Sequence, residues 1–277
     1  MGSYAPPDPA VTALSEHTAL ESALKHDRWL TVGALAITAL LCWSWIVPMA
    51  LDMYGTMNGA ASWMMASEWD WTCTLLLFAM WLVMMIGMML PSAAPTLLLY
   101  AMVIRKSPQG EHTHARIYAF AAGYLVVWTL FSAAVTPLQR MLSDLMLLSP
   151  MMELQNRPLS AALLIGAGAY QLTALKRACL NHCRSPAHFI ATGFRPGNTG
   201  AFRMGFEHGL YCLGCCWALM LLLFVGGIMN LWVIAAITLF VLFEKVAPPG
   251  ARGGRLSGAL LILVGLWALL GPLLIRH

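Results

Sequence analysis

Cysteine and histidine side chains gather in two short stretches of this 277-residue sequence, and no other residues in it are so well suited to chemistry. Five of the seven cysteines fall within 38 residues, and two histidines accompany them. The set is Cys179, His182 and Cys183, followed by His208, Cys212, Cys215 and Cys216. Residues three and four apart share a helix face, so each stretch predicts one ligand-bearing face, with Cys216 at the edge of the second. Thiolate and imidazole ligands suit Cu(I), Zn(II) or an iron–sulfur cluster.

Two other interpretations of these cysteines stay open. Buried cysteines are often inert packing residues, and this is the expected role of the isolated Cys42 and Cys73. If the whole group only packs, the protein is a structural subunit of a larger membrane complex. Alternatively, Cys212 and Cys215 form a Cys-x-x-Cys pair at a predicted helix start, where thiols become more acidic, which is typical of a thiol–disulfide oxidoreductase. The concentration of thiols and imidazoles in helical register favours metal binding over both.

Methionine is the second unusual feature, with 19 residues in the chain. Thioethers bind Cu(I) without losing a proton, so a Met-rich external segment predicts a surface that receives the metal. The candidate group lies at and after the end of the first apolar block: Met49, Met53, Met57, Met64 and Met65. A second group, Met80, Met84 and Met88, forms a stripe at four-residue spacing, for which helix packing is the favoured interpretation and metal transfer the alternative.

The elements that must position these residues are predicted from composition. The chain is 60% hydrophobic and only 10% charged, whereas soluble proteins are about 25% charged. This excludes a soluble enzyme, and the thin positive charge excludes a nucleic-acid binder. The apolar residues form blocks long enough to cross a bilayer, which predicts an all-α transmembrane helix bundle. We expect about seven spans, near residues 29–51, 72–104, 117–138, 159–175, 208–228, 231–246 and 256–275.

The order of the blocks predicts a polar cytoplasmic segment, 1–28, followed by a single transmembrane domain, 29–277. The second block contains Pro91 and Pro95, and we interpret it as one helix, with a hairpin turning at Pro91-Ser92 as the alternative. With one helix, thirteen Lys and Arg fall on one side of the membrane and three on the other. The positive-inside rule then predicts a cytoplasmic N-terminus.

This orientation places the cysteine group at the cytoplasmic edge of the fourth and fifth spans, where thiols stay reduced and available as metal ligands. Nearby charges have predicted partners: Glu207 is expected to orient His208, and Glu244 to pair with Lys245 or a loop arginine. No carboxylate falls in the middle of a predicted span, which argues against a proton-coupled transporter.

Four stretches together resemble the bacterial integral-membrane family known as domain of unknown function 2182. They are Met84-Met-Ile-Gly-Met-Met-Leu-Pro-Ser-Ala-Ala-Pro95, Cys179-Leu-Asn-His-Cys183, His208-Gly-Leu-Tyr-Cys-Leu-Gly-Cys-Cys-Trp217 and Phe224-Val-Gly-Gly-Ile-Met-Asn230. The resemblance extends from about Trp71 to Arg255, and members of the family are predicted to bind metal. It implies a metal-binding role for this chain, within which we expect copper handling.

The sequence therefore predicts a multi-pass protein of the bacterial inner membrane that binds a soft transition metal. Copper as Cu(I) is the expected ion, with zinc and an iron–sulfur cluster as alternatives. The expected role is delivery, buffering or insertion of the metal into a partner protein, rather than catalysis. No nucleic-acid partner is expected.

Overall fold

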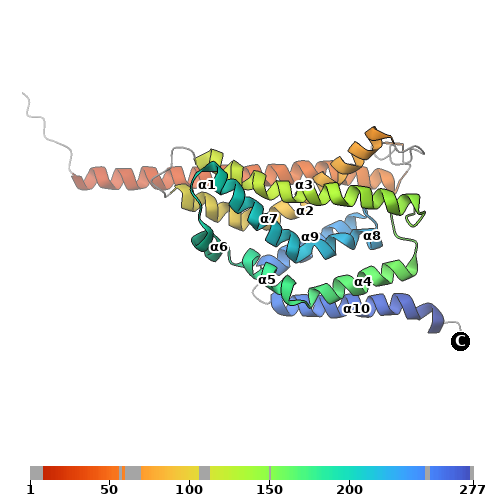
Figure 1. Ribbon diagram of the computed structural model, residues 1–277. Helices are drawn as coiled ribbons and strands as arrows, with labels where there is room; N and C mark the ends of the chain where they lie inside the picture. The colour runs from red at the N-terminus through yellow and green to blue at the C-terminus, as the bar shows by residue number, and fades with distance from the viewer. Residues whose placement is uncertain are drawn as a thin grey trace, which may run out of the picture.

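The structure, a computed structural model, describes residues 9–55, 58–59, 70–105, 113–149, 151–246 and 250–274. Side chains are described from residue 29 onward within these ranges, apart from those of 250–252 and 271–274. The elements are α-helices, and they confirm the all-α class (Figure 1). In chain order they are α1 (Pro9–Met53), α2 (Trp71–Arg105), α3 (Thr113–Asp144), α4 (Arg157–Gln171), α5 (Ala174–Arg184), α6 (Pro186–Gly193), α7 (Gly197–Leu221), α8 (Leu223–Gly226), α9 (Leu231–Val246) and α10 (Gly250–Leu274).

Five helical stretches in the described residues are long and apolar enough to cross a membrane: Trp29–Met53, Trp71–Arg105, Thr113–Asp144, Gly197–Gly226 and Gly253–Leu270. The pair α4 and α5 makes a sixth if its two helices count as one broken span. Helix α9 matches the sixth predicted span in its bounds but has only 16 residues. The structure thus supports a bundle of five or six candidate spans rather than the predicted seven. Helix α1 runs without a break from the predicted polar segment into the first predicted span.

Helix α2 settles the choice between one helix and a hairpin in the second apolar block. It continues through Pro91 and Pro95 to Arg105, so the hairpin alternative is wrong. Proline has no backbone N–H, so Pro91 and Pro95 leave the carbonyls of Gly87 and Pro91 without their usual intrahelical donors, which a packed bundle tolerates. Side chains also bond the backbone of this stretch: the carbonyl of Met89 accepts from Ser92 Oγ at 2.8 Å and from Tyr124 Oη at 3.0 Å.

Two predicted spans differ from the observed helices. The predicted span 159–175 is interrupted, because α4 and α5 meet at an angle of 62°. Thr173 caps the second helix, its side chain accepting a hydrogen bond from the backbone N–H of Lys176 at 3.2 Å. The predicted span 208–228 begins too late, since α7 starts at Gly197. The stretch containing His208 therefore lies inside a helix rather than at its start.

Glycines allow two pairs of helices to approach closely. Helices α3 and α7 lie side by side, as do α4 and α10 (Figure 1). A Cβ atom added to Gly205 would meet the backbone carbonyl of Phe120, and one added to Gly123 would meet that of Phe202. In α4 and α10, Gly168 and Gly258 face each other in the same way. Small residues at such contacts are typical of packed membrane helices.

We therefore expect Gly205→Ala to destabilise the bundle by about 1–3 kcal/mol, because neither backbone is free to move away from the added methyl group. The midpoint of thermal unfolding in detergent measures this. Gly166→Ala in α4 is the matched control, since no atom lies within 4 Å of the position of its Cβ. Equal midpoints for the two variants would show that the close contact of α3 and α7 does not limit stability.

Candidate metal centre

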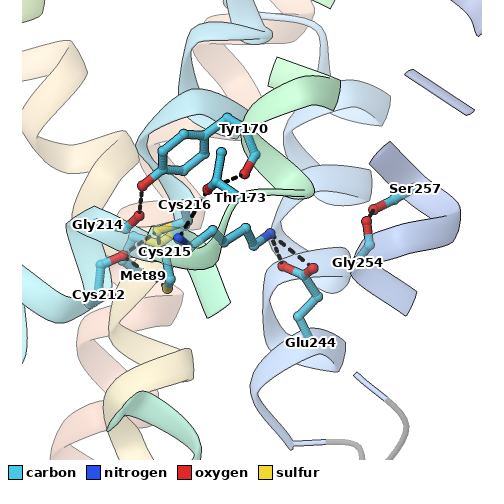
Figure 2. A network of polar contacts seen from close by, with 11 residues as sticks. Met89, Tyr170, Thr173, Cys212, Gly214, Cys215, Cys216, Glu244, Gly254 and Ser257 are labelled. Atoms are coloured by element: carbon cyan, nitrogen blue, oxygen red, sulfur yellow. Dashed lines mark hydrogen bonds and ion pairs between the residues drawn. The ribbon is translucent and has the colours of Figure 1, made fainter. Parts of the chain in front are cut away.

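Three buried thiols lie together on one side of α7. Cys212, Cys215 and Cys216 expose 0%, 2% and 1% of their surface. Cys215 Sγ donates to the carbonyl of Cys212 at 3.1 Å, and Cys216 Sγ donates to the same carbonyl at 2.8 Å. Cys212 and Cys216 are one helical turn apart and lie on the same face, whereas the sequence analysis placed Cys216 only at the edge of the face that carries Cys212 and Cys215. Figure 2 shows these three cysteines gathered beside Met89.

Helix α2 adds a fourth sulfur atom to this group. The thiol of Cys216 lies 3.8 Å from Sδ of Met89, a residue that is itself fully buried. We refer to Cys212, Cys216 and Met89 as the sulfur site. Its members come from two helices that are far apart in the sequence, and it contains two thiols and one thioether, all of them soft ligands.

The sulfur site also has polar neighbours from α3 and α9. Tyr124 Oη and Cys212 Sγ share a hydrogen bond of 3.1 Å. Lys245 Nζ lies 2.9 Å from Cys212 Sγ and also donates to Ser92 Oγ at 2.8 Å. The Lys245 side chain is buried, so its ammonium reaches the thiol from inside the bundle. Cys212 thus has a cation and a hydroxyl group beside it.

The predicted residues of α5 lie around this group but not all in it. Cys183 is buried and its thiol lies beside that of Cys215. Cys179 packs against α7, where its sulfur fills the space beside Gly214. His182 stacks on the ring of Tyr211, with ring centroids 4.1 Å apart and planes 13° apart. Helix α5 therefore brings one thiol, that of Cys183, to the buried thiols of α7.

His208 lies on the face of α7 that carries Cys212, one turn nearer the start of the helix. It exposes only 2% of its surface and is surrounded by the rings of Phe120, Tyr124 and Phe189. Its buried Nδ1 atom has no hydrogen-bond partner in the structure. Burying a nitrogen atom without a hydrogen-bond partner costs free energy. The Nδ1 atom of this imidazole is therefore available to bind another group.

The predicted cluster of seven Cys and His ligands is not present as a formed metal site. Across the described ranges, no group of three or more His, Cys, Asp or Glu side chains is arranged to hold a metal ion. The sulfur site has a different composition, because its third sulfur belongs to a methionine. Thiolate and thioether ligands bind Cu(I), zinc and iron–sulfur clusters among the common biological metals, so the donor set that is present is compatible with copper.

Buried charges near the site have partners that differ from the predicted ones. Glu244 pairs with Lys176, whose Nζ lies 2.7 and 2.9 Å from its two carboxylate oxygens, and both side chains are 2% exposed (Figure 2). The predicted pairing of Glu244 with Lys245 is therefore wrong. Glu207 contacts Arg195 at 3.0 Å and Arg203 at 3.3 Å, and these ion pairs take the place of the predicted role beside His208.

The methionines of the predicted external surface divide into two sets. Met49 and Met53 are each 1% exposed and pack in the hydrophobic core, so neither contributes to a surface. Met57, Met64 and Met65 lie outside the described residues. The stripe of Met80, Met84 and Met88 is also buried in the core, which agrees with the packing interpretation.

Sequence reasoning missed Met89 as a member of the sulfur site, and it missed Tyr124 and Lys245 as the polar neighbours of that site. Lys245 could have been recognised from the sequence, because it lies at the end of an otherwise apolar stretch. A helix bundle buries a lysine only when the ammonium has a partner. Met89 could be noticed only as a neighbour of the methionine stripe. Tyr124 had no signal in the sequence, since aromatic residues are common in apolar helices.

Comparison with known proteins places this chain in a family. The model of one protein family, described as "PpoB2: Copper chaperone", matches residues 78–268, more than two thirds of the sequence. No curated protein and no solved structure matches the chain. The match supports the metal-related part of the expected resemblance, although this family does not carry the label of domain of unknown function 2182. The matched region contains α2 from its second turn, all of α3 to α9, and every residue of the sulfur site. The chain belongs to the PpoB2 family of copper chaperones.

Proposed function

We propose that this protein is a membrane-embedded copper chaperone that holds Cu(I) at the sulfur site and passes it to a partner protein. The observation that carries the proposal is the contact of Cys216 with Met89 at 3.8 Å, directly beside Cys212. Two thiolates and a thioether form a soft, buried ligand set that binds hard divalent ions only weakly. Copper is the cargo of this site, and the thiols and the thioether are its ligands.

The remaining predicted ligands extend the sulfur site toward α5. Cys215 is the next thiol on α7 and lies beside Cys183, while Cys179 lies against Gly214 and His182 against Tyr211. A chaperone must release its metal, and a series of soft ligands permits release by stepwise ligand exchange. We propose that Cu(I) leaves the sulfur site through Cys215 and Cys183 toward Cys179 and His182. The unpartnered Nδ1 of His208 is a further ligand available on the α7 side.

We also propose that the protein lies in the bacterial inner membrane with its N-terminus in the cytoplasm. The apolar candidate spans and the unequal distribution of Lys and Arg support this placement. Burial in such a bundle keeps water and oxidants from the thiols. Labelling of single engineered cysteines at positions 2 and 276 with an impermeant thiol reagent, in whole and in opened cells, tests the orientation.

The thiol–disulfide oxidoreductase alternative has lost its structural basis. Its premise was a Cys-x-x-Cys pair at a helix start, but Cys212 and Cys215 lie well inside α7. Both thiols are buried, so neither is accessible to the disulfide of a protein substrate. All seven cysteines are free in the structure.

The direct test of the function is the metal content of the purified protein. We expect protein purified in detergent from copper-supplemented cells, without exposure to air, to contain copper near one ion per chain by mass spectrometry. It should also give up this copper to an excess of a Cu(I)-specific chelator, because a chaperone binds reversibly. A protein with negligible copper, even after anaerobic loading with Cu(I), would contradict the proposal.

Met89→Leu is expected to weaken Cu(I) binding by at least about tenfold, the lower limit for the loss of a group that tunes a metal site. Leucine keeps the volume of the side chain and removes only the sulfur, so the fold should be preserved. Competition with a chromogenic Cu(I) chelator measures the affinity. Met85→Leu is the matched control, because Met85 is equally buried on α2 but is not a member of the sulfur site. Equal affinities for the two variants would remove Met89 from the ligand set.

A further inference from the structure

Lys245 is a buried cation in direct contact with a proposed metal ligand, and the proposed function leaves it without a role. Its Nζ lies 2.9 Å from Cys212 Sγ. A second hydrogen bond, to Ser92 Oγ at 2.8 Å, fixes the ammonium between α2 and α7. A lysine placed only for packing or solubility would extend its amine to water. This one points into the bundle, at the sulfur atom.

The other charges near the site cancel. Lys176 and Glu244 form a buried pair with oxygen–nitrogen distances of 2.7 and 2.9 Å, so together they add no net charge. This leaves the Lys245 ammonium as the uncompensated formal charge beside the thiols among the described residues. In a low-dielectric interior, net charge is costly, and the site is favoured when its total approaches zero.

The charge balance distinguishes ions by valence. With Cys212 and Cys216 as thiolates, a monovalent ion and the Lys245 ammonium bring the total to zero, and the thioether of Met89 adds no charge. A divalent ion in the same place neutralises the two thiolates by itself, so the total is +1 and the Lys245 ammonium stays uncompensated in the interior. The ammonium is also repelled more strongly by a divalent ion than by a monovalent one.

We propose that Lys245 is a specificity-determining residue that makes the sulfur site selective for monovalent Cu(I) over thiophilic divalent ions. The proposal rests on the proposed function, since it requires the metal to bind at Cys212 and Cys216. Selectivity then comes from two features together: soft sulfur ligands exclude hard ions, and the fixed ammonium excludes soft ions of higher charge. Soft ligands alone do not discriminate between Cu(I) and a divalent ion that also prefers sulfur.

The first experiment uses the wild-type protein and needs no variant. Ag(I) serves as the air-stable monovalent probe and Cd(II) as the divalent thiophilic probe. Their affinities are compared with those for a soluble peptide that contains two cysteines four residues apart and no cation. We expect the ratio of Ag(I) to Cd(II) affinity to be at least about tenfold larger for the protein than for the peptide. A ratio equal to or below that of the peptide overturns the inference.

Variants then assign the effect to Lys245. Lys245→Met should lower the protein's ratio by at least about tenfold, and Lys245→Arg, which keeps the charge, should retain most of it. The double variant Lys176→Met/Glu244→Gln is the matched control, because it removes two charges that already cancel, and its ratio should equal that of the wild type. A Lys245→Met protein that keeps the wild-type ratio overturns the inference. If Lys245→Met does not fold, the comparison of wild type with peptide decides alone.

The same measurements separate this inference from the proposed function. If the wild type binds neither Ag(I) nor Cd(II) more tightly than Cys212→Ala/Cys216→Ala does, the sulfur site itself is refuted. If the wild type binds both ions through these cysteines but discriminates no better than the peptide, the site stands and only the role of Lys245 is refuted.

Discussion

Replacing both Cys212 and Cys216 with alanine is expected to lower the affinity of the protein for Cu(I) by at least about a thousandfold. Zinc-finger peptides bind structural Zn²⁺ through four ligands with a free energy of about 10–16 kcal/mol, so by analogy the loss of two anionic ligands should cost at least about 4 kcal/mol of binding free energy, which is a thousandfold in affinity. The thioether of Met89 that remains is neutral and cannot replace them. Anaerobic competition with a chromogenic Cu(I) chelator measures the loss.

The control for this double variant comes from the same chain. Cys42→Ala/Cys73→Ala also removes two buried thiols, but these lie in α1 and in the first turn of α2, outside the sulfur site. Its Cu(I) affinity should remain within about twofold of the wild-type value, as expected for sites that do not interact. Equal losses in both double variants would mean that copper binding depends on the general state of the bundle rather than on the sulfur site.

Lys176→Met is expected to have the largest effect on stability, lowering the free energy of unfolding by about 3–5 kcal/mol. Lys176 and Glu244 are each 2% exposed, so removing the ammonium leaves a carboxylate without its partner in the interior. The pair connects α5 to α9, two helices that also border the thiols. The apparent midpoint of thermal unfolding in detergent reports the change.

The double variant Lys176→Met/Glu244→Gln tests the cause of that loss. Removing both charges leaves no buried ion without a partner, and such replacements are often nearly neutral. We therefore expect the double variant to recover most of the stability that Lys176→Met loses. A double variant as unstable as the single one would show that Lys176 stabilises the fold through packing, for example against the ring of Phe240, which lies 5.9 Å from its Nζ.

The helices were predictable where the signal is local. The length and hydropathy of the apolar blocks predicted α2 to within one residue, α9 at its observed bounds and α3 to within six residues, because the hydropathy of a block needs no information from the rest of the chain. The bend between α4 and α5 was not predictable in this way. It depends on Thr173 capping a new helix inside an apolar stretch, a local hydrogen bond that hydropathy does not register.

The candidate site was likewise predictable within a single helix but not between helices. Helical periodicity grouped the three cysteines of α7 on neighbouring faces, because residues on one helix have fixed relative positions, but it placed Cys216 at the edge and Cys215 beside Cys212. It did not predict the contact of Cys216 with Met89 or of Cys212 with Lys245, since both depend on how separate helices pack. From the sequence, Glu244 was expected to pair with Lys245 or a loop arginine, whereas burial selected Lys176 from another helix. The contacts that define the chemistry are thus tertiary.

The measurement that tests the central claim most directly is X-ray absorption at the copper edge of the anaerobically Cu(I)-loaded protein. The claim is that Cys212, Cys216 and Met89 hold the metal. We predict a first coordination shell dominated by sulfur, with fewer sulfur neighbours in Met89→Leu and an unchanged shell in Met85→Leu. A first shell of nitrogen or oxygen, or a sulfur shell that persists unchanged in Cys212→Ala/Cys216→Ala, would contradict the claim.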